Sequence, residues 1–125
     1  MKSRQVQSRR NVSHFAIGKL LALDVRQLDS CTMGDRALQL EIIDLFMDQL
    51  TGAQKKLSVA KFQVDEAKYM GHTLRGAALS IGAVEIAAIA AGWDELAFEQ
   101  AELRRLLKQA AVRFKAAAGE FLQLS

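Results

Sequence analysis

The sequence predicts an all-α protein, an antiparallel up-and-down four-helix bundle with a short additional N-terminal helix. The 125 residues contain no proline, and aromatic residues are only 6% of the chain. The segments after residue 34 are rich in Ala, Leu, Glu, Gln, Lys and Arg, which favour helix and leave little that reads as strand. Apolar residues recur at three- and four-residue steps in four long segments, a pattern typical of amphipathic helices around one core.

Composition indicates one domain in a reducing compartment. Half of the residues are apolar and a quarter are charged, as in an ordinary globular domain of this length. Cys31 is the single cysteine, which excludes a disulfide framework and a thiol metal site. No apolar run reaches the roughly 18 residues of a membrane span, and no signal-peptide core follows the basic start. We therefore expect a cytoplasmic protein with no membrane partner.

The formal charge of +3 is concentrated at the N-terminus. Four basic residues fall in the first ten positions, whereas the remaining 115 residues hold 13 basic and 14 acidic side chains. We expect residues 1–14 to form a basic flexible tail and residues 15–125 to form the helical domain. Because that domain is close to neutral, a nucleic-acid partner is not expected.

The first half of the chain contains two short elements and one long helix. An apolar stretch predicts a short helix over Phe15–Leu23, and Asp24 is suited to cap a second short turn through Leu28. Gly34 interrupts the pattern, and Asp35 is suited to N-cap a helix over 36–59. Its predicted buried stripe is Leu38, Ile42, Leu45, Phe46, Gln49, Ala53 and Leu57.

Three further helices follow a connection at 58–63. The first covers about 65–81, and Gly82 ends or loosens it. The second covers about 84–97 and is expected to bury Ala87, Ile89 or Ala90, Trp93 and Leu96. The third covers about 99–122 and is expected to bury Leu103, Leu106 or Leu107, Ala110, Phe114, Ala117 and Phe121.

His72 is the most informative residue, because a helix over 65–81 places it in solvent. At about 100° per residue, the apolar side chains gather on the opposite face. These are Ala67, Met70, Leu74, Ala77, Ala78 and Ile81. Lys68 at i−4 and Arg75 at i+3 flank the histidine, and Gly76 lies one turn further on without a side chain to crowd the imidazole.

This pattern suits a phosphoryl carrier. Imidazole titrates near neutral pH, so a neutral nitrogen with a lone pair is available to attack phosphorus. Phosphorylation adds about two negative charges, which Lys68 and Arg75 are placed to offset. Gly76 costs roughly 1 kcal/mol of helix stability relative to Ala, and room for a phosphoryl group explains that cost. Leu79 and Ala83 extend the face with apolar surface for docking another protein.

The stretch His72-Thr-Leu-Arg-Gly-Ala-Ala-Leu-Ser-Ile-Gly-Ala83 resembles the signature of histidine-containing phosphotransfer (HPt) domains. That signature is His, any residue, Leu, Lys, Gly, two small residues, then an apolar residue and Gly. The segments 32–38 and 41–46 are similar to the family's first long helix and its start, and 93–96 fits the helix after the phosphohistidine helix. The resemblance covers roughly residues 20–122.

The resemblance implies a phosphorelay intermediate that is not itself an enzyme. His72 would accept a phosphoryl group from a receiver-domain aspartate and pass it to a second receiver or return it. Arg75 replaces the usual Lys and keeps the charge, whereas Gly71 replaces a frequent Ala and predicts a more pliable helix. We expect no metal and no cofactor in this chain, because the magnesium of aspartyl-phosphate chemistry belongs to the receiver. Besides Lys68, Arg75, Leu79 and Ala83, the surface for receiver domains and a sensor or hybrid kinase would include Met47.

Three other functions fit parts of the pattern. The chain is expected to be a monomer, either a free-standing phosphotransfer protein or one domain of a longer kinase. A kinase dimerisation helix pair also displays a phosphorylated histidine, but there an acidic residue and then a proline typically follow it; here Thr73 follows and proline is absent. A non-catalytic adaptor would use the His72 face for binding alone. A metal or hydrolase site would need partners that His14, His72 and Ser80 lack in the sequence pattern.

Overall fold

The computed structural model describes residues 20–58, 63–95 and 98–124, and everything regular in it is α-helix. Its elements are α2 (Val25–Thr32), α3 (Arg36–Leu57), α4 (Val64–Ile81), α5 (Val84–Asp94) and α6 (Gln100–Leu124). The prediction of an all-α protein is therefore confirmed. The predicted tail at 1–14, the first residues of the 15–23 helix and Leu96 lie outside the described residues.

The N-terminal elements differ from prediction in one respect. The described part of the predicted 15–23 helix, Leu20 to Leu23, is not helical. The segment lies against the α4–α5 turn, because the Glu85 N–H donates to the Leu21 carbonyl (3.0 Å) and the Asp24 N–H donates to the Gly82 carbonyl (2.7 Å). These long-range hydrogen bonds satisfy backbone groups that a helix would have paired locally.

Both predicted aspartate caps are present. The Asp24 carboxylate accepts from the N–H groups of Arg26 (3.1 Å) and Gln27 (3.3 Å), and α2 runs one turn beyond the predicted end at Leu28. The Asp35 carboxylate accepts from the Leu38 N–H (3.1 Å) and starts α3 where predicted. Gly82 adopts φ 86°, a left-handed conformation that ends α4 as expected.

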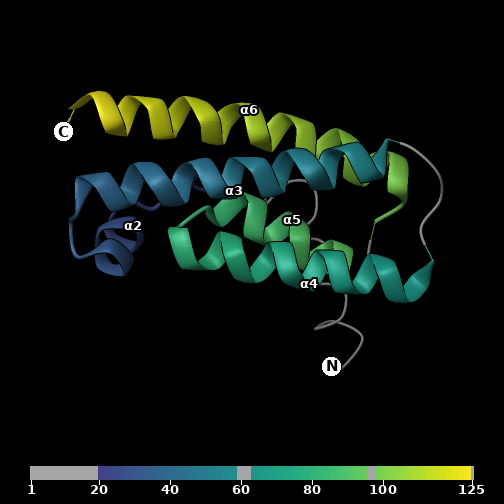
Figure 1. Cartoon of the computed structure of the whole chain (residues 1–125). Helices are drawn as coiled ribbons and strands as arrows, with labels where there is room; N and C mark the ends of the chain where they lie inside the picture. The colour runs from purple at the N-terminus through teal and green to yellow at the C-terminus, as the bar shows by residue number, and fades with distance from the viewer. Residues whose placement is uncertain (1–19, 59–62, 96–97, 125) are drawn as a thin grey trace, which may run out of the picture.

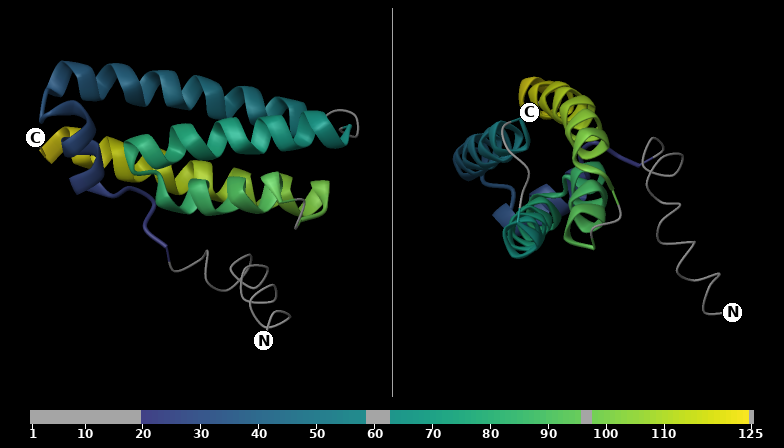
Figure 2. Two further views of the ribbon diagram at one scale, coloured as in Figure 1. Left: turned by 90° about the horizontal axis from the view of Figure 1, so that it is seen from below. Right: turned by 90° about the vertical axis from the view of Figure 1, so that its right-hand side faces the viewer.

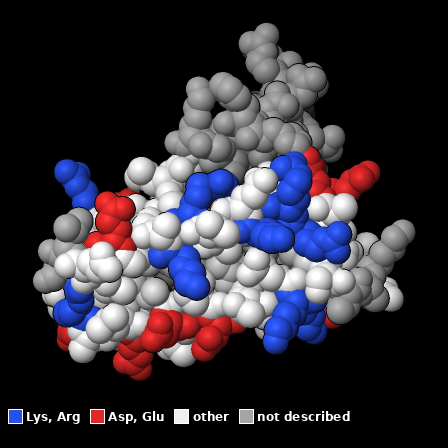
Figure 3. Space-filling view, turned by 90° about the horizontal axis from the view of Figure 1, so that it is seen from above, with Lys and Arg blue, Asp and Glu red and all other residues white. Residues whose placement is uncertain are grey.

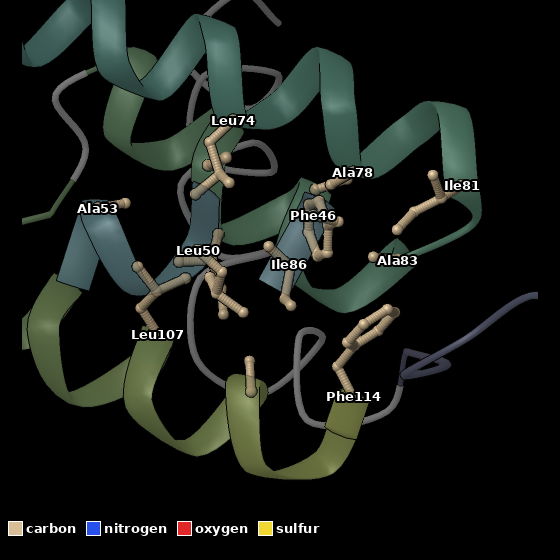
Figure 4. Close-up of a cluster of buried hydrophobic side chains, with 14 of the residues drawn as sticks. Phe46, Leu50, Ala53, Leu74, Ala78, Ile81, Ala83, Ile86, Leu107 and Phe114 are labelled. Carbon is tan, nitrogen blue, oxygen red and sulfur yellow. The ribbon is translucent and has the colours of Figure 1, made fainter. Parts of the chain in front are cut away.

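The four long helices run in alternating directions and surround one core (Figures 1 and 2). α3 packs against α4 and α6, and α5 packs against the same two helices; α2 covers one end of the α3–α4 pair. Each long helix contributes apolar side chains to the interior, as the close-up in Figure 4 shows. Phe46 of α3 and Phe114 of α6 meet edge to face with ring centroids 5.2 Å apart.

The prediction of which α3 side chains are buried was partly wrong. Phe46, Ala53 and Leu57 are buried as predicted, but Leu38 and Leu45 are exposed. Buried Gln39 takes the place of Leu38, because its amide donates to Asp29 Oδ1 (2.8 Å) and Thr32 Oγ1 (3.1 Å) of α2. Both members of the Ile89/Ala90 and Leu106/Leu107 alternatives are buried. In the last turns of α6, Ala117 and Phe121 are only half-buried, and Ala118 is buried instead.

An ion pair between a buried carboxylate and a half-exposed guanidinium joins α5 to α6. Glu85 is only 1% exposed, and both its carboxylate oxygens accept from the guanidinium of Arg113, at 2.9 and 3.1 Å for Nε. The hydrogen bonds to Glu85 raise the pKa of Arg113 above its ordinary value.

None of the described helices is long and apolar enough to cross a membrane.

Candidate functional site

His72 lies on the exposed side of α4, as the helical pattern predicted. The opposite side of this helix carries the buried residues Ala67, Gly71, Leu74, Ala78 and Ile81. The His72 side chain is 77% exposed. The imidazole is therefore directly accessible to another molecule.

Asp94 is the nearest described acidic partner of His72, and we did not predict it. Its Oδ2 atom lies 3.8 Å from Nδ1 of the imidazole, within ion-pair range but beyond a hydrogen bond. Asp94 is the last residue of α5, and its side chain is 27% exposed. In the sequence, His72 lies ten residues before Gly82 and Asp94 twelve residues after it. In an antiparallel helix pair such positions lie side by side, so this spacing was the available signal.

Gly71 has a packing role that was not predicted from the sequence. A Cβ atom at position 71 would lie 2.5 Å from the backbone nitrogen of Asp94 and 2.9 Å from its Cα atom. Any side chain here would therefore push α5 away from α4. The glycine allows the close approach that places Asp94 beside His72.

The cations and the open space predicted around His72 are present. Lys68 and Arg75 are exposed, and neither makes an ion pair within the part of the chain that the structure describes. A Cβ atom at Gly76 would meet no atom within 4 Å, so the surface one turn after the histidine is unobstructed. The Ser80 hydroxyl donates to the Gly76 carbonyl (2.8 Å) and is engaged locally.

The predicted docking residues divide into three cases. Leu79 is 52% exposed and shares the open side of α4. Ala83 is fully buried, so its assignment to the docking surface was wrong; it follows the α4–α5 turn and faces the core near Ile81 and Ile86 (Figure 4). Met47 is half-buried and packs against the core from α3.

Tyr69 is an exposed residue of this face that the sequence analysis missed. Its side chain belongs to the same helix as His72, three positions earlier, and the residue is 72% exposed. Tyr69, His72, Gly76 and Leu79 follow one another at three- and four-residue steps, so they share one stripe of α4. We call these four residues the α4 stripe.

Candidate metal ligands do not cluster among the described residues. Across residues 20–58, 63–95 and 98–124, no group of three or more His, Cys, Asp or Glu side chains is placed to hold an ion.

Comparisons with protein-family models, curated proteins and solved structures found no match for this chain.

Proposed function

We propose that this protein is a histidine phosphotransfer protein of a phosphorelay. In this proposal His72 accepts a phosphoryl group from a receiver-domain aspartate and passes it to another receiver. The observation that carries the proposal is the exposed His72 imidazole, with Nδ1 toward Asp94 at 3.8 Å and open surface at Gly76 one turn away. The resemblance of residues 72–83 to the HPt signature supports the same function.

The transfer step follows from the orientation of the ring. With Nδ1 toward Asp94, Nε2 is the nitrogen available to attack. Its lone pair forms an N–P bond while the P–O bond to the receiver aspartate breaks, and that carboxylate leaves with the bonding electrons. The imidazole keeps its Nδ1 proton and gains positive charge, which the Asp94 carboxylate stabilises.

The surroundings of His72 also suit the charge that the phosphoryl group brings. Lys68 and Arg75 lie one turn before and one turn after the histidine, and both are exposed. Their positive charges attract the equatorial oxygens during transfer and the phosphoryl group afterwards. The magnesium that receiver chemistry requires would be held by the receiver, so this chain would need no cofactor of its own.

We further propose that α3, α4, α5 and α6 form the antiparallel four-helix bundle expected of an HPt domain. The alternating helix directions and the shared core support this arrangement. Receiver domains and the kinase that feeds the relay would dock on the α4 stripe, where Tyr69 and Leu79 offer apolar contact. We expect a monomer that acts in the cytoplasm.

Phosphoryl transfer from a purified, phosphorylated receiver domain tests this function. Wild-type protein should gain an acid-labile, base-stable phosphoryl group, and the His72→Gln variant should gain none. Leu79→Asp, which adds charge to exposed apolar surface, should weaken receiver binding and transfer together.

The same experiment distinguishes a binding adaptor from a phosphoryl carrier. An adaptor would bind receivers equally well with His72→Gln and would never be phosphorylated. If several receivers bind but transfer nothing, the adaptor function replaces the proposed one. If the His72→Gln variant is labelled as strongly as the wild type, another residue is the acceptor.

A further inference from the structure

A groove lies between the C-terminal end of α3 and the first half of α6. It encloses about 580 Å³ and is lined by Gln54, Ser58, Ala101, Arg104, Arg105 and Lys108. Arg105 and Lys108 also line a second hollow of about 470 Å³, which continues along α6 to Val112 and Arg113. The two hollows therefore form one surface, which we call the α6 groove.

The α6 groove is strongly basic. The α6 helix carries five basic residues and only two acidic ones, Glu102 and Glu120. Arg104 and Lys108 are exposed and make no ion pair within the described residues, while Arg105 lies 3.9 Å from Glu102. Figure 3, which views the molecule from the side of α6, shows Lys and Arg side chains gathered on this face. Arg113 is paired with Glu85, so Arg104 and Lys108 are the groove cations without an acidic partner among the described residues. Their positive charge attracts an anionic partner.

The groove also offers apolar surface between its cations. Val112, which lines the second hollow, is 66% exposed, and Ala101 lines the first. An amphipathic helix can lay apolar side chains on this surface while its acidic side chains reach the flanking cations. We propose that the α6 groove docks an acidic amphipathic helix of a partner protein.

Two other occupants are outcomes of the peptide experiment. Single-stranded nucleic acid is held by stacking bases on aromatic side chains, and none of the described residues that line the two hollows is aromatic. A second copy of this chain could offer a face of α3, where Glu41, Leu45 and Asp48 are exposed at three- and four-residue steps.

The α6 groove and His72 are on different sides of the molecule. His72 belongs to α4, and in the end-on view α6 lies across the core from α4 (Figure 2). The principal neighbours of α6 are α3 and α5, not α4. A helix in the groove would leave the imidazole uncovered, so the inference is independent of the proposed function.

Binding of a synthetic peptide to the full-length chain tests the inference. The probe is a fluorescent 18-residue peptide designed to form an amphipathic helix. Leu residues at i, i+3, i+4 and i+7 form its apolar face, and Glu residues lie on both sides of that face. A scrambled peptide of the same composition is the peptide control. The groove variant is Arg105→Glu with Lys108→Glu, and the matched control is Lys68→Glu with Arg75→Glu, which makes the same charge change on α4.

We expect the amphipathic peptide to bind the wild type more tightly than its scrambled control. The groove variant should weaken this binding roughly tenfold, and the α4 variant should leave it unchanged. Helicity measured by circular dichroism should be equal in all proteins; if charge reversal lowers it, Arg105→Gln with Lys108→Gln replaces that variant.

Three results would overturn the inference. Equal weakening by both variants, or equal binding of both peptides, would show that only net charge matters. Tighter binding of an oligonucleotide or of anionic lipid vesicles, lost in the groove variant, would assign the groove to phosphate-bearing ligands. A dimer of the chain alone that the groove variant abolishes would assign it to a second copy.

Discussion

Gly71 holds the backbone of α4 against the backbone of Asp94 at the end of α5. A Cβ atom at position 71 would lie 2.5 Å from the Asp94 nitrogen, a distance that side chains do not tolerate. His72 follows Gly71 directly and faces the Asp94 carboxylate at 3.8 Å. The packing of two helices therefore determines the surroundings of the proposed nucleophile.

Replacing Gly71 with alanine should destabilise the protein and disturb the site. The obstructing atoms belong to the backbone of Asp94, so α5 has to shift, which we expect to lower the free energy of unfolding by about 1–3 kcal/mol. Urea unfolding measures this loss. An unchanged midpoint and slope would contradict the close packing that the structure shows.

Replacing Gly76 with alanine should separate stability from function. Because no atom lies within 4 Å of the added Cβ, the variant should gain about 0.5–1 kcal/mol of stability from helix propensity. Phosphoryl transfer should nevertheless slow about tenfold, since the partner needs this space.

Gly52→Ala on α3 is the matched control, because a Cβ atom there also meets nothing. It should gain similar stability and transfer at the wild-type rate. Equal transfer rates in the Gly76 and Gly52 variants would show that the partner does not use the open surface beside His72.

Replacing Asp94 with asparagine should slow transfer without preventing it. The carboxylate stabilises positive charge on the imidazole across 3.8 Å at a largely exposed site, where such an interaction is worth about 1 kcal/mol. We therefore expect a roughly fivefold slower transfer. The difference between wild type and variant should shrink as salt is added, and a salt-independent difference would indicate that Asp94 acts by packing alone.

Much of the fold was predictable because its signals are local. Asp24, Asp35 and Gly82 mark helix ends through their own side chains or backbone conformations, and the structure uses all three. The exposure of His72 followed from the apolar spacing along one helix. These features need no knowledge of how distant segments meet.

The remaining features depend on contacts between segments. Gln39 is buried because α2 supplies acceptors for its amide, and nothing near it in the sequence indicates this. Ala83 is buried because the α4–α5 turn directs it into the core, whereas a continued helix would have exposed it. Asp94 reaches His72 only because Gly71 lets two helices approach.

Removing the guanidinium of Arg113 should destabilise the protein. Glu85 is buried and would lose the partner of its carboxylate, so Arg113→Ala should lower the free energy of unfolding by about 3 kcal/mol. This is the low end for buried pairs, because half of the Arg113 side chain is exposed. Lys115→Ala, an exposed substitution on the same helix, should change stability by about 0.5 kcal/mol or less.

The pH dependence of stability provides a second check on this pair. The pKa of Arg113 is raised in the folded protein. The charged guanidinium therefore stabilises the fold fully below the ordinary arginine pKa, and this stabilisation is lost only as the pH rises through the pKa of Arg113 in the folded state. The Arg113 guanidinium should therefore add no pH dependence to stability around neutral pH. Urea unfolding of the wild type and of Arg113→Ala should give the same difference in the free energy of unfolding at pH 7 and at pH 9. A difference that falls over this range would contradict a guanidinium that stays charged beside Glu85.

Nuclear magnetic resonance of the protein labelled with 15N in histidine, after transfer from a phosphorylated receiver, measures phosphorylation of His72 most directly. We expect a phosphoramidate with 31P–15N coupling to Nε2 of His72, because Nδ1 faces Asp94. The signal should be absent from the His72→Gln variant. Phosphorus bonded to another residue, or no phosphoramidate while the receiver loses its phosphoryl group only to water, would contradict the assignment of His72 as the acceptor.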